Sequence, residues 1–132
     1  MKKILIIDSY NSSNSIIAEA LINRYLNGIK AYSIGVNPIN EIDSNTIKIL
    51  ELEDLWSDEY QTKNLDKVLD IEFDLVIIVS EIKDDITDKF PKKVEIISVI
   101  FDDPIGEDFE KFTQITQEIK DKLLPIVRKK LS

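Results

Sequence analysis

The stretch ILIIDSYNSSNSIIAE, residues 4–19, decides the fold class, because a strand pattern, a polar loop and a helix pattern follow one another in it. Ile4–Ile7 form a short, continuous apolar run, which is typical of a strand buried on both faces of a parallel sheet. Small polar residues follow from Asp8 to Ser15, and apolar residues then recur at helical spacing as far as Leu26. This succession predicts a parallel α/β protein.

The rest of the chain continues the alternation of strands and helices. Further strands are expected at residues 30–34, 73–79 and 94–100, and helices at 14–26, from Ser44 to Leu52, at 65–69 and from about Asp108. Ser15 is expected in the cap region of the first helix and Ser44 at the cap of the second, while Pro125 should kink or end the last one. The order predicts a three-layer α/β/α fold with a four-stranded parallel sheet, in a single domain spanning residues 1–132.

The composition of the 132 residues excludes several kinds of chemistry. A net charge of −8, from 17 basic and 25 acidic residues, argues against binding to the phosphate backbone of nucleic acids. The absence of Cys and His excludes thiol nucleophiles, disulfides and histidine acid–base catalysis. The first residues lead directly into a strand rather than a signal peptide, and no apolar run approaches the roughly 18 residues that span a bilayer. We expect a cytoplasmic protein that binds neither nucleic acid nor membrane and has no cofactor.

The loops that follow the predicted strands are the places to look for a ligand site, since ligands of parallel sheets bind at the carboxyl ends of the strands. These loops are Asp8–Ser15, the segment from Ser80 onward, and Asp102–Pro104. The first is rich in small polar residues and precedes a helix, so its backbone N–H groups can form an anion-binding cradle. The alternative is that its Asn and Ser residues only form turns and cap the helix.

Four segments of the chain carry a family resemblance. Within residues 4–19 the matching positions are Asn11, Ser12, Ser15, Ala18 and Glu19. They are followed in order by YSIGVNP at 32–38, FDLVIIVSEIKDDITDKFPKKV at 73–94 and FDDP at 101–104. Together these segments resemble the low-molecular-weight protein tyrosine phosphatases and the related thioredoxin-coupled arsenate reductases. The resemblance covers nearly the whole chain and implies the phosphotyrosine phosphatase I-like fold.

The resemblance also implies that two catalytic groups are missing. It places the nucleophilic Cys of the family at Asp8, its oxyanion-binding Arg at Asn14 and its general-acid Asp at Asp103. The additional redox cysteines of the reductases fall near Ser80 and Thr87. The implied protein is a pseudoenzyme with a degenerate oxyanion loop and a binding or regulatory role, in which the remaining loop positions are Ser9, Tyr10, Asn11, Ser12, Ser13 and Ser15.

A carboxylate at position 8 opposes the binding of phosphate or arsenate. Two unit charges about 4 Å apart interact by about 4 kcal/mol at an effective dielectric constant of 20, and a dianion doubles this repulsion. The lost Arg removes charge-assisted hydrogen bonds of about 1.5 to 3 kcal/mol each. Oxyanion binding is therefore expected to be weak or absent. Instead, Asp8 itself is expected to serve as a built-in anion for the loop, where the N–H groups and the helix N-terminus favour its ionised form.

Two other interpretations remain open at this stage. Haloacid dehalogenase type phosphatases also have an Asp after the first strand, so Asp8 could be a nucleophile, with Asp102 and Asp103 as further ligands of a magnesium ion. Their second Asp, two residues later, is here Tyr10. Response-regulator receiver domains begin similarly, but their phosphoacceptor position falls on Val79 or Ser80. Finally, the aromatic residues Tyr10, Trp56 and Tyr60 could flank the cleft and offer a surface to an unknown protein partner.

Overall fold

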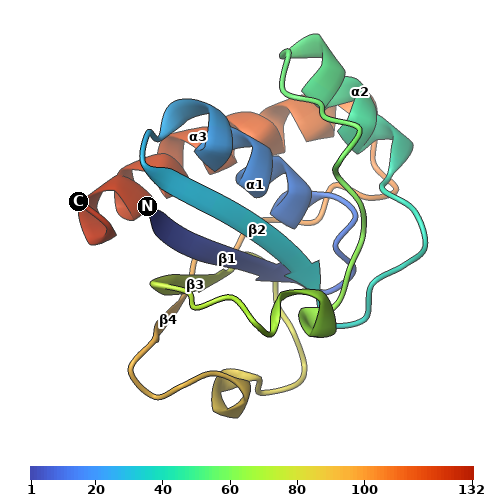
Figure 1. The fold of residues 1–132 in the computed structure, drawn as a ribbon. Helices are drawn as coiled ribbons and strands as arrows, with labels where there is room; N and C mark the ends of the chain where they lie inside the picture. The colour runs from blue at the N-terminus through green and yellow to red at the C-terminus, as the bar shows by residue number, and fades with distance from the viewer.

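The computed structural model describes residues 1–132 and contains a four-stranded parallel sheet (Figure 1). The strands are β1 (Lys2–Asp8), β2 (Ile29–Gly35), β3 (Leu75–Ile78) and β4 (Glu95–Ser98), in the spatial order β2-β1-β3-β4. The helices are α1 (Asn14–Tyr25), α2 (Ser44–Leu52) and α3 (Phe109–Lys130), and two short 3₁₀ segments are η1 (Leu65–Val68) and η2 (Thr87–Lys89). The predicted α/β class is confirmed.

The two faces of the sheet are covered differently. Ile4 and Ile6 of β1 pack in a large apolar cluster with α1, α2 and α3, which gather on one side of the sheet in Figure 1. Leu5 and Ile7 face the other way, into a smaller cluster that includes Val68 of η1. The second outer layer thus consists of η1, η2 and loops rather than α-helices. Because β1 is buried on both faces, it carries the continuous apolar run that was expected of a central strand.

Two of the expected helix boundaries are wrong. Helix α2 is capped by Asp43, whose side chain accepts a hydrogen bond from the Asn45 N–H, and not by Ser44. Helix α3 continues through Pro125 to Lys130. A proline inside a helix removes one backbone hydrogen bond. The buried apolar residues of the last two turns, Leu123, Leu124 and Val127, hold the helix against the core on both sides of Pro125.

The N-terminus of α1 is capped by Asp8, a residue outside the helix that was not expected to cap it. Ser13 is its N-cap but makes no side-chain capping bond, and Ser15 lies inside the first turn. The carboxylate of Asp8, at the end of β1, accepts a hydrogen bond from the Ser15 N–H instead. The strand end and the helix start are therefore joined through one side chain. None of the helices is both long and apolar enough to cross a membrane.

Candidate functional site

A cleft of about 330 Å³ lies at the carboxyl ends of β1, β3 and β4, where the sequence placed it. It is formed by the three loops that follow these strands. Its lining residues are Asp8, Ser9, Tyr10, Ser12, Ser13, Asn14, Ser80, Glu81, Ile100, Phe101, Asp102, Asp103 and Ile105. The structure therefore brings Asp8, Asn14 and Asp103, the three residues to which the resemblance assigned the nucleophile, arginine and general-acid positions, into one cleft.

Asp8 is buried beneath this cleft, and both of its carboxylate oxygens are engaged by the loop that follows it. One oxygen accepts the Asn11 N–H at 2.7 Å and the other accepts the Ser15 N–H at 3.0 Å. Burial raises the pKa of the Asp8 carboxyl above its ordinary value, and the two N–H groups lower it by less. The expectation that the loop and helix favour the ionised form is therefore wrong in its net direction, because desolvation outweighs the hydrogen bonds.

The loop around Asp8 is held in shape by Asn11. This residue has a positive φ of 53°, a conformation in which Asn is several times more frequent than most residues. Its amide nitrogen donates to the hydroxyls of Ser15 at 2.8 Å and Ser33 at 3.0 Å, and its amide oxygen accepts the Lys63 N–H at 2.8 Å. Gly35 makes room for this turn, because a Cβ there would lie 2.7 Å from the Asn11 backbone nitrogen.

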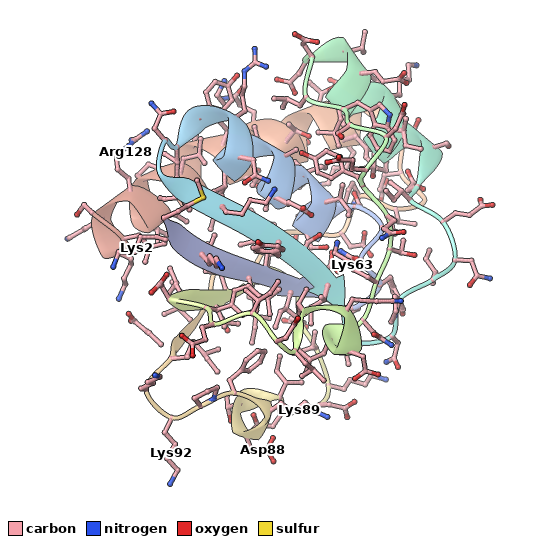
Figure 2. The ribbon with its side chains drawn as sticks, viewed as in Figure 1. Lys2, Lys63, Asp88, Lys89, Lys92 and Arg128 are labelled. Atoms are coloured by element: carbon pink, nitrogen blue, oxygen red, sulfur yellow. The ribbon has the colours of Figure 1, made fainter.

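An ion pair between Lys63 and Glu19 supports the same loop through Ser33. The Ser33 hydroxyl donates to Glu19, and the Lys63 ammonium lies 3.8 Å from the same Glu19 oxygen. Figure 2 shows Lys63 beside the carboxyl end of β2. There the backbone carbonyl of Lys63 accepts a hydrogen bond from the Gly35 N–H. Burial raises the pKa of Glu19 and lowers the pKa of Lys63. Sequence reasoning missed Ser33 and Lys63, because residues 63 and 19 lie far apart in the chain and no local pattern connects them.

Asn14, to which the resemblance assigned the arginine position, joins two loops of the cleft. Its amide nitrogen donates to the backbone carbonyl of Asp102 at 2.9 Å, and its amide oxygen is buried without a partner. The hydroxyls of Ser12, Ser13 and Ser80 are also buried and unpartnered. Asn14 thus joins the start of α1 to the segment between β4 and α3, and unused hydrogen-bonding capacity remains around the cleft.

The arrangement of Asp8, Asp102 and Asp103 does not suit a metal ion. No group of three His, Cys, Asp or Glu residues lies close enough together to hold one. Asp103 is exposed and accepts the Ile105 N–H at 3.0 Å. The Asp102 side chain is 80% exposed and lies 3.4 Å from the Lys111 ammonium. The three carboxylates considered for a magnesium site therefore do not converge in the structure.

Only one of the three aromatic residues expected around the cleft lies there. Tyr10 lines it and is about half exposed. Trp56 and Tyr60 line a different hollow, next to residues 40–42 and 61–62, and pack edge to face with their ring centroids 5.8 Å apart. The expectation that Trp56 and Tyr60 flank the cleft is therefore wrong.

This site defines a class of protein: a parallel α/β fold in which a loop rich in N–H donors joins the first strand to the first helix, as in proteins that bind anions there. Here the carboxylate of Asp8 occupies two of those donors. A family model described as low molecular weight phosphotyrosine protein phosphatase matches residues 3–131, so the chain belongs to this family. The predicted family is confirmed.

Solved structures show that the same fold occurs in other proteins. An arsenate reductase from Archaeoglobus fulgidus is 24% identical, with a TM-score of 0.82, over 94% of this chain and 98% of the other. A low molecular weight protein tyrosine phosphatase from T. tengcongensis is 18% identical, with a TM-score of 0.82, over 98% and 99%. An arginine phosphatase from Geobacillus stearothermophilus is 21% identical, with a TM-score of 0.81, over 98% and 92%. No curated protein sequence gives a significant match.

Proposed function

We propose that this protein is a catalytically inactive member of its family that acts in the cytoplasm by binding a protein partner. The observation that carries the proposal is the position of the Asp8 carboxylate. It stands at the nucleophile position, and both of its oxygens already accept N–H groups of the loop, from Asn11 and Ser15. A carboxylate held in this way is neither free to attack a phosphorus atom nor compatible with a second anion in the same loop.

The residue at the arginine position supports the same conclusion. Asn14 carries no charge, and its amide nitrogen is used to hold the Asp102 carbonyl. No Lys or Arg residue is among those that line the cleft. An incoming dianion therefore meets repulsion from Asp8 without the charge-assisted hydrogen bonds, about 1.5 to 3 kcal/mol each, that an arginine supplies. Asp103 retains the position of the general acid, but without a nucleophile it has no leaving group to protonate.

The proposal is tested by measuring turnover and oxyanion binding together. The wild-type protein is expected to give no turnover of p-nitrophenyl phosphate above background and no change in Tm with phosphate, arsenate or vanadate. The double variant Asp8→Cys/Asn14→Arg should regain vanadate binding, seen as a rise in Tm, because it removes the repelling charge and restores a guanidinium.

The matched control for this experiment is Asp84→Cys/Asn37→Arg, which makes the same changes of residue type at positions that do not line the cleft. It should remain insensitive to vanadate. Turnover by the wild-type protein, or vanadate binding with a Kd in the micromolar range, would contradict the proposal. A folded Asp8→Cys/Asn14→Arg variant without vanadate binding would show that the loop lacks the geometry of an oxyanion site.

A further inference from the structure

The cleft at the ends of β1, β3 and β4 has a strongly one-sided charge. Four carboxyl side chains line it, those of Asp8, Glu81, Asp102 and Asp103, and no Lys or Arg side chain does. Carboxylates gathered around a concave space create a negative potential that attracts cations and repels anions, and three of these four, Glu81, Asp102 and Asp103, are exposed. The charge preference expected of an oxyanion site is therefore reversed in this chain.

Buried polar atoms without partners provide a second, independent sign of a ligand. The Ser12 and Ser13 hydroxyls and the Asn14 amide oxygen make no hydrogen bond, although these residues line the cleft and are at most 3% exposed. The large majority of buried polar atoms in proteins have a partner. Three oxygens that can accept hydrogen bonds, next to carboxylates, suit a ligand that carries several N–H donors.

The exposed lining of the cleft also includes apolar side chains. Tyr10, Ile100 and Ile105 line it, and their side chains are 47%, 48% and 37% exposed. A long basic side chain has an aliphatic stem and a charged head, and it packs its stem on apolar surface while its head reaches polar groups. An aromatic ring in the lining can also attract the cationic head. Exposed apolar side chains next to exposed carboxylates match this shape.

A metal ion fits the same cleft less well than an organic cation. The carboxylates are distributed around a space of about 330 Å³, and no three of them converge. Both oxygens of Asp8 are already used by backbone N–H groups. A space of this volume is at the lower end of the range for small-ligand pockets. It therefore suits a group with donors at several positions, such as a guanidinium or an ammonium on a flexible stem.

We propose that this cleft binds an arginine or lysine side chain presented by a partner protein, with the stem against Tyr10, Ile100 and Ile105 and the cationic head toward Asp102, Asp103 and Glu81. The proposal deepens the proposed function and depends on it, because it requires a cleft that holds no oxyanion. Ser12, Ser13 and Asn14, whose side-chain oxygens are buried without a hydrogen-bond partner, line the same cleft. The acidic character of the cleft thus identifies the partner surface as basic.

The direct test uses short capped peptides as probes. N-acetylated, C-terminally amidated Gly-Arg-Gly and Gly-Lys-Gly are titrated into the full chain, and backbone amide shifts are followed by NMR. Shifts are expected in residues 9–15, 80–81 and 100–106, with binding that weakens as the salt concentration rises. The Gly-citrulline-Gly peptide keeps the shape of the arginine peptide without its charge, so its binding should be at least tenfold weaker.

Variants with opposite expected effects on peptide affinity make the test more specific. Asp102→Asn/Asp103→Asn should weaken binding of the arginine peptide by about tenfold, since each exposed ion pair contributes up to about fivefold. Lys111→Gln should strengthen it by about two- to fivefold, because Lys111 lies 3.4 Å from Asp102 and competes with the ligand. Glu51→Gln/Glu118→Gln is the matched control, because it removes the same charge from exposed helical positions outside the cleft.

The outcomes separate this proposal from the function on which it rests. Equal affinity for the arginine and citrulline peptides, shifts outside the cleft, or unchanged binding by Asp102→Asn/Asp103→Asn would overturn the basic-ligand proposal. Binding of calcium or magnesium at the same residues, in preference to the peptides, would overturn it as well. Vanadate binding or turnover by the wild-type chain would instead overturn the proposed function. A chain that binds neither vanadate nor the basic peptides contradicts only the further inference.

Discussion

At the scale of single residues, Asp8 has the largest effect on what the site can do. Its two oxygens satisfy backbone N–H groups on either side of the loop, at Asn11 and Ser15. A phosphate or arsenate ion would need such N–H donors, and the side chain takes them first. The loop therefore keeps its shape without any external anion, and one residue accounts both for the missing nucleophile and for the order of the loop.

Removing the Asp8 carboxylate should destabilise the protein. Asp8→Ala leaves the Asn11 and Ser15 N–H groups without their acceptor, and an unsatisfied buried donor costs about 1 to 3 kcal/mol. We expect a loss of about 2 to 4 kcal/mol in the free energy of unfolding, measured by urea denaturation. Asp84→Ala, at an exposed position, is the control and should change stability by less than about 0.5 kcal/mol. Equal stability of the two variants would show that Asp8 does not support the loop.

At the scale of secondary-structure elements, helix α3 connects the cleft to the core. Its N-cap Asp108 follows the segment that carries Asp102 and Asp103, and its apolar residues pack against α1 and β3 in the large core cluster. The hydrogen bond from Asn14 to the Asp102 carbonyl joins the same segment to α1. The position of the acidic residues therefore depends on two helices that pack on one face of the sheet.

Pro125 is a weak point of α3 that can be tested separately from the cleft. It lies on the exposed side of the helix, while Leu124 and Val127 are buried. Pro125→Ala restores a backbone N–H and removes the ring clash, so we expect the free energy of unfolding to rise by about 1 to 3 kcal/mol. Thermal and urea unfolding should show the increase without any change in the NMR shifts of residues 9–15. A less stable variant would mean that Pro125 itself supports the packing of α3.

At the scale of the whole molecule, the fold buries titratable groups whose shifted pKa values change the stability of the protein in different pH ranges. Burial raises the pKa of Asp8 above 3.8 and that of Glu19 above 4.5. The folded chain therefore holds these protons to a higher pH than the unfolded chain does, and the associated stability is lost as pH rises through the raised values. Burial lowers the pKa of Lys63 below 10.5, so its contribution increases with pH only in the alkaline range.

The stability that protonation of Asp8 and Glu19 contributes is accordingly expected to be greatest near or below their ordinary pKa values and to fall as the pH rises from about 4 through the raised values. The net charge of −8 acts in the same direction, because acidification reduces self-repulsion. Thermal unfolding over this range is the measurement, and Glu19→Gln should show a shallower dependence because it removes one of the two shifted carboxyls. The same pH dependence of Tm in the wild-type protein and in Glu19→Gln would contradict the raised pKa of Glu19.

The sequence alone determined the order of the elements, the parallel sheet, the family and the place of the cleft. Apolar runs such as Ile4–Ile7 indicate burial on both faces of the sheet, and the residue list is enough to show that the chain has no Cys. These features are local, since they depend on neighbours in the chain or on the chemistry of one residue. The roles assigned to the loop residues and the partner remain predictions.

Only the tertiary structure decided how the polar groups are paired. It turned both oxygens of Asp8 toward N–H groups, brought Lys63 to Glu19 and Ser33, and placed Trp56 and Tyr60 away from the cleft. Such pairings depend on side-chain direction and on burial, which arise when segments distant in sequence pack together. Desolvation of Asp8 follows from that packing as well, and for this reason its pKa moved opposite to the direction that its neighbours in the chain predicted.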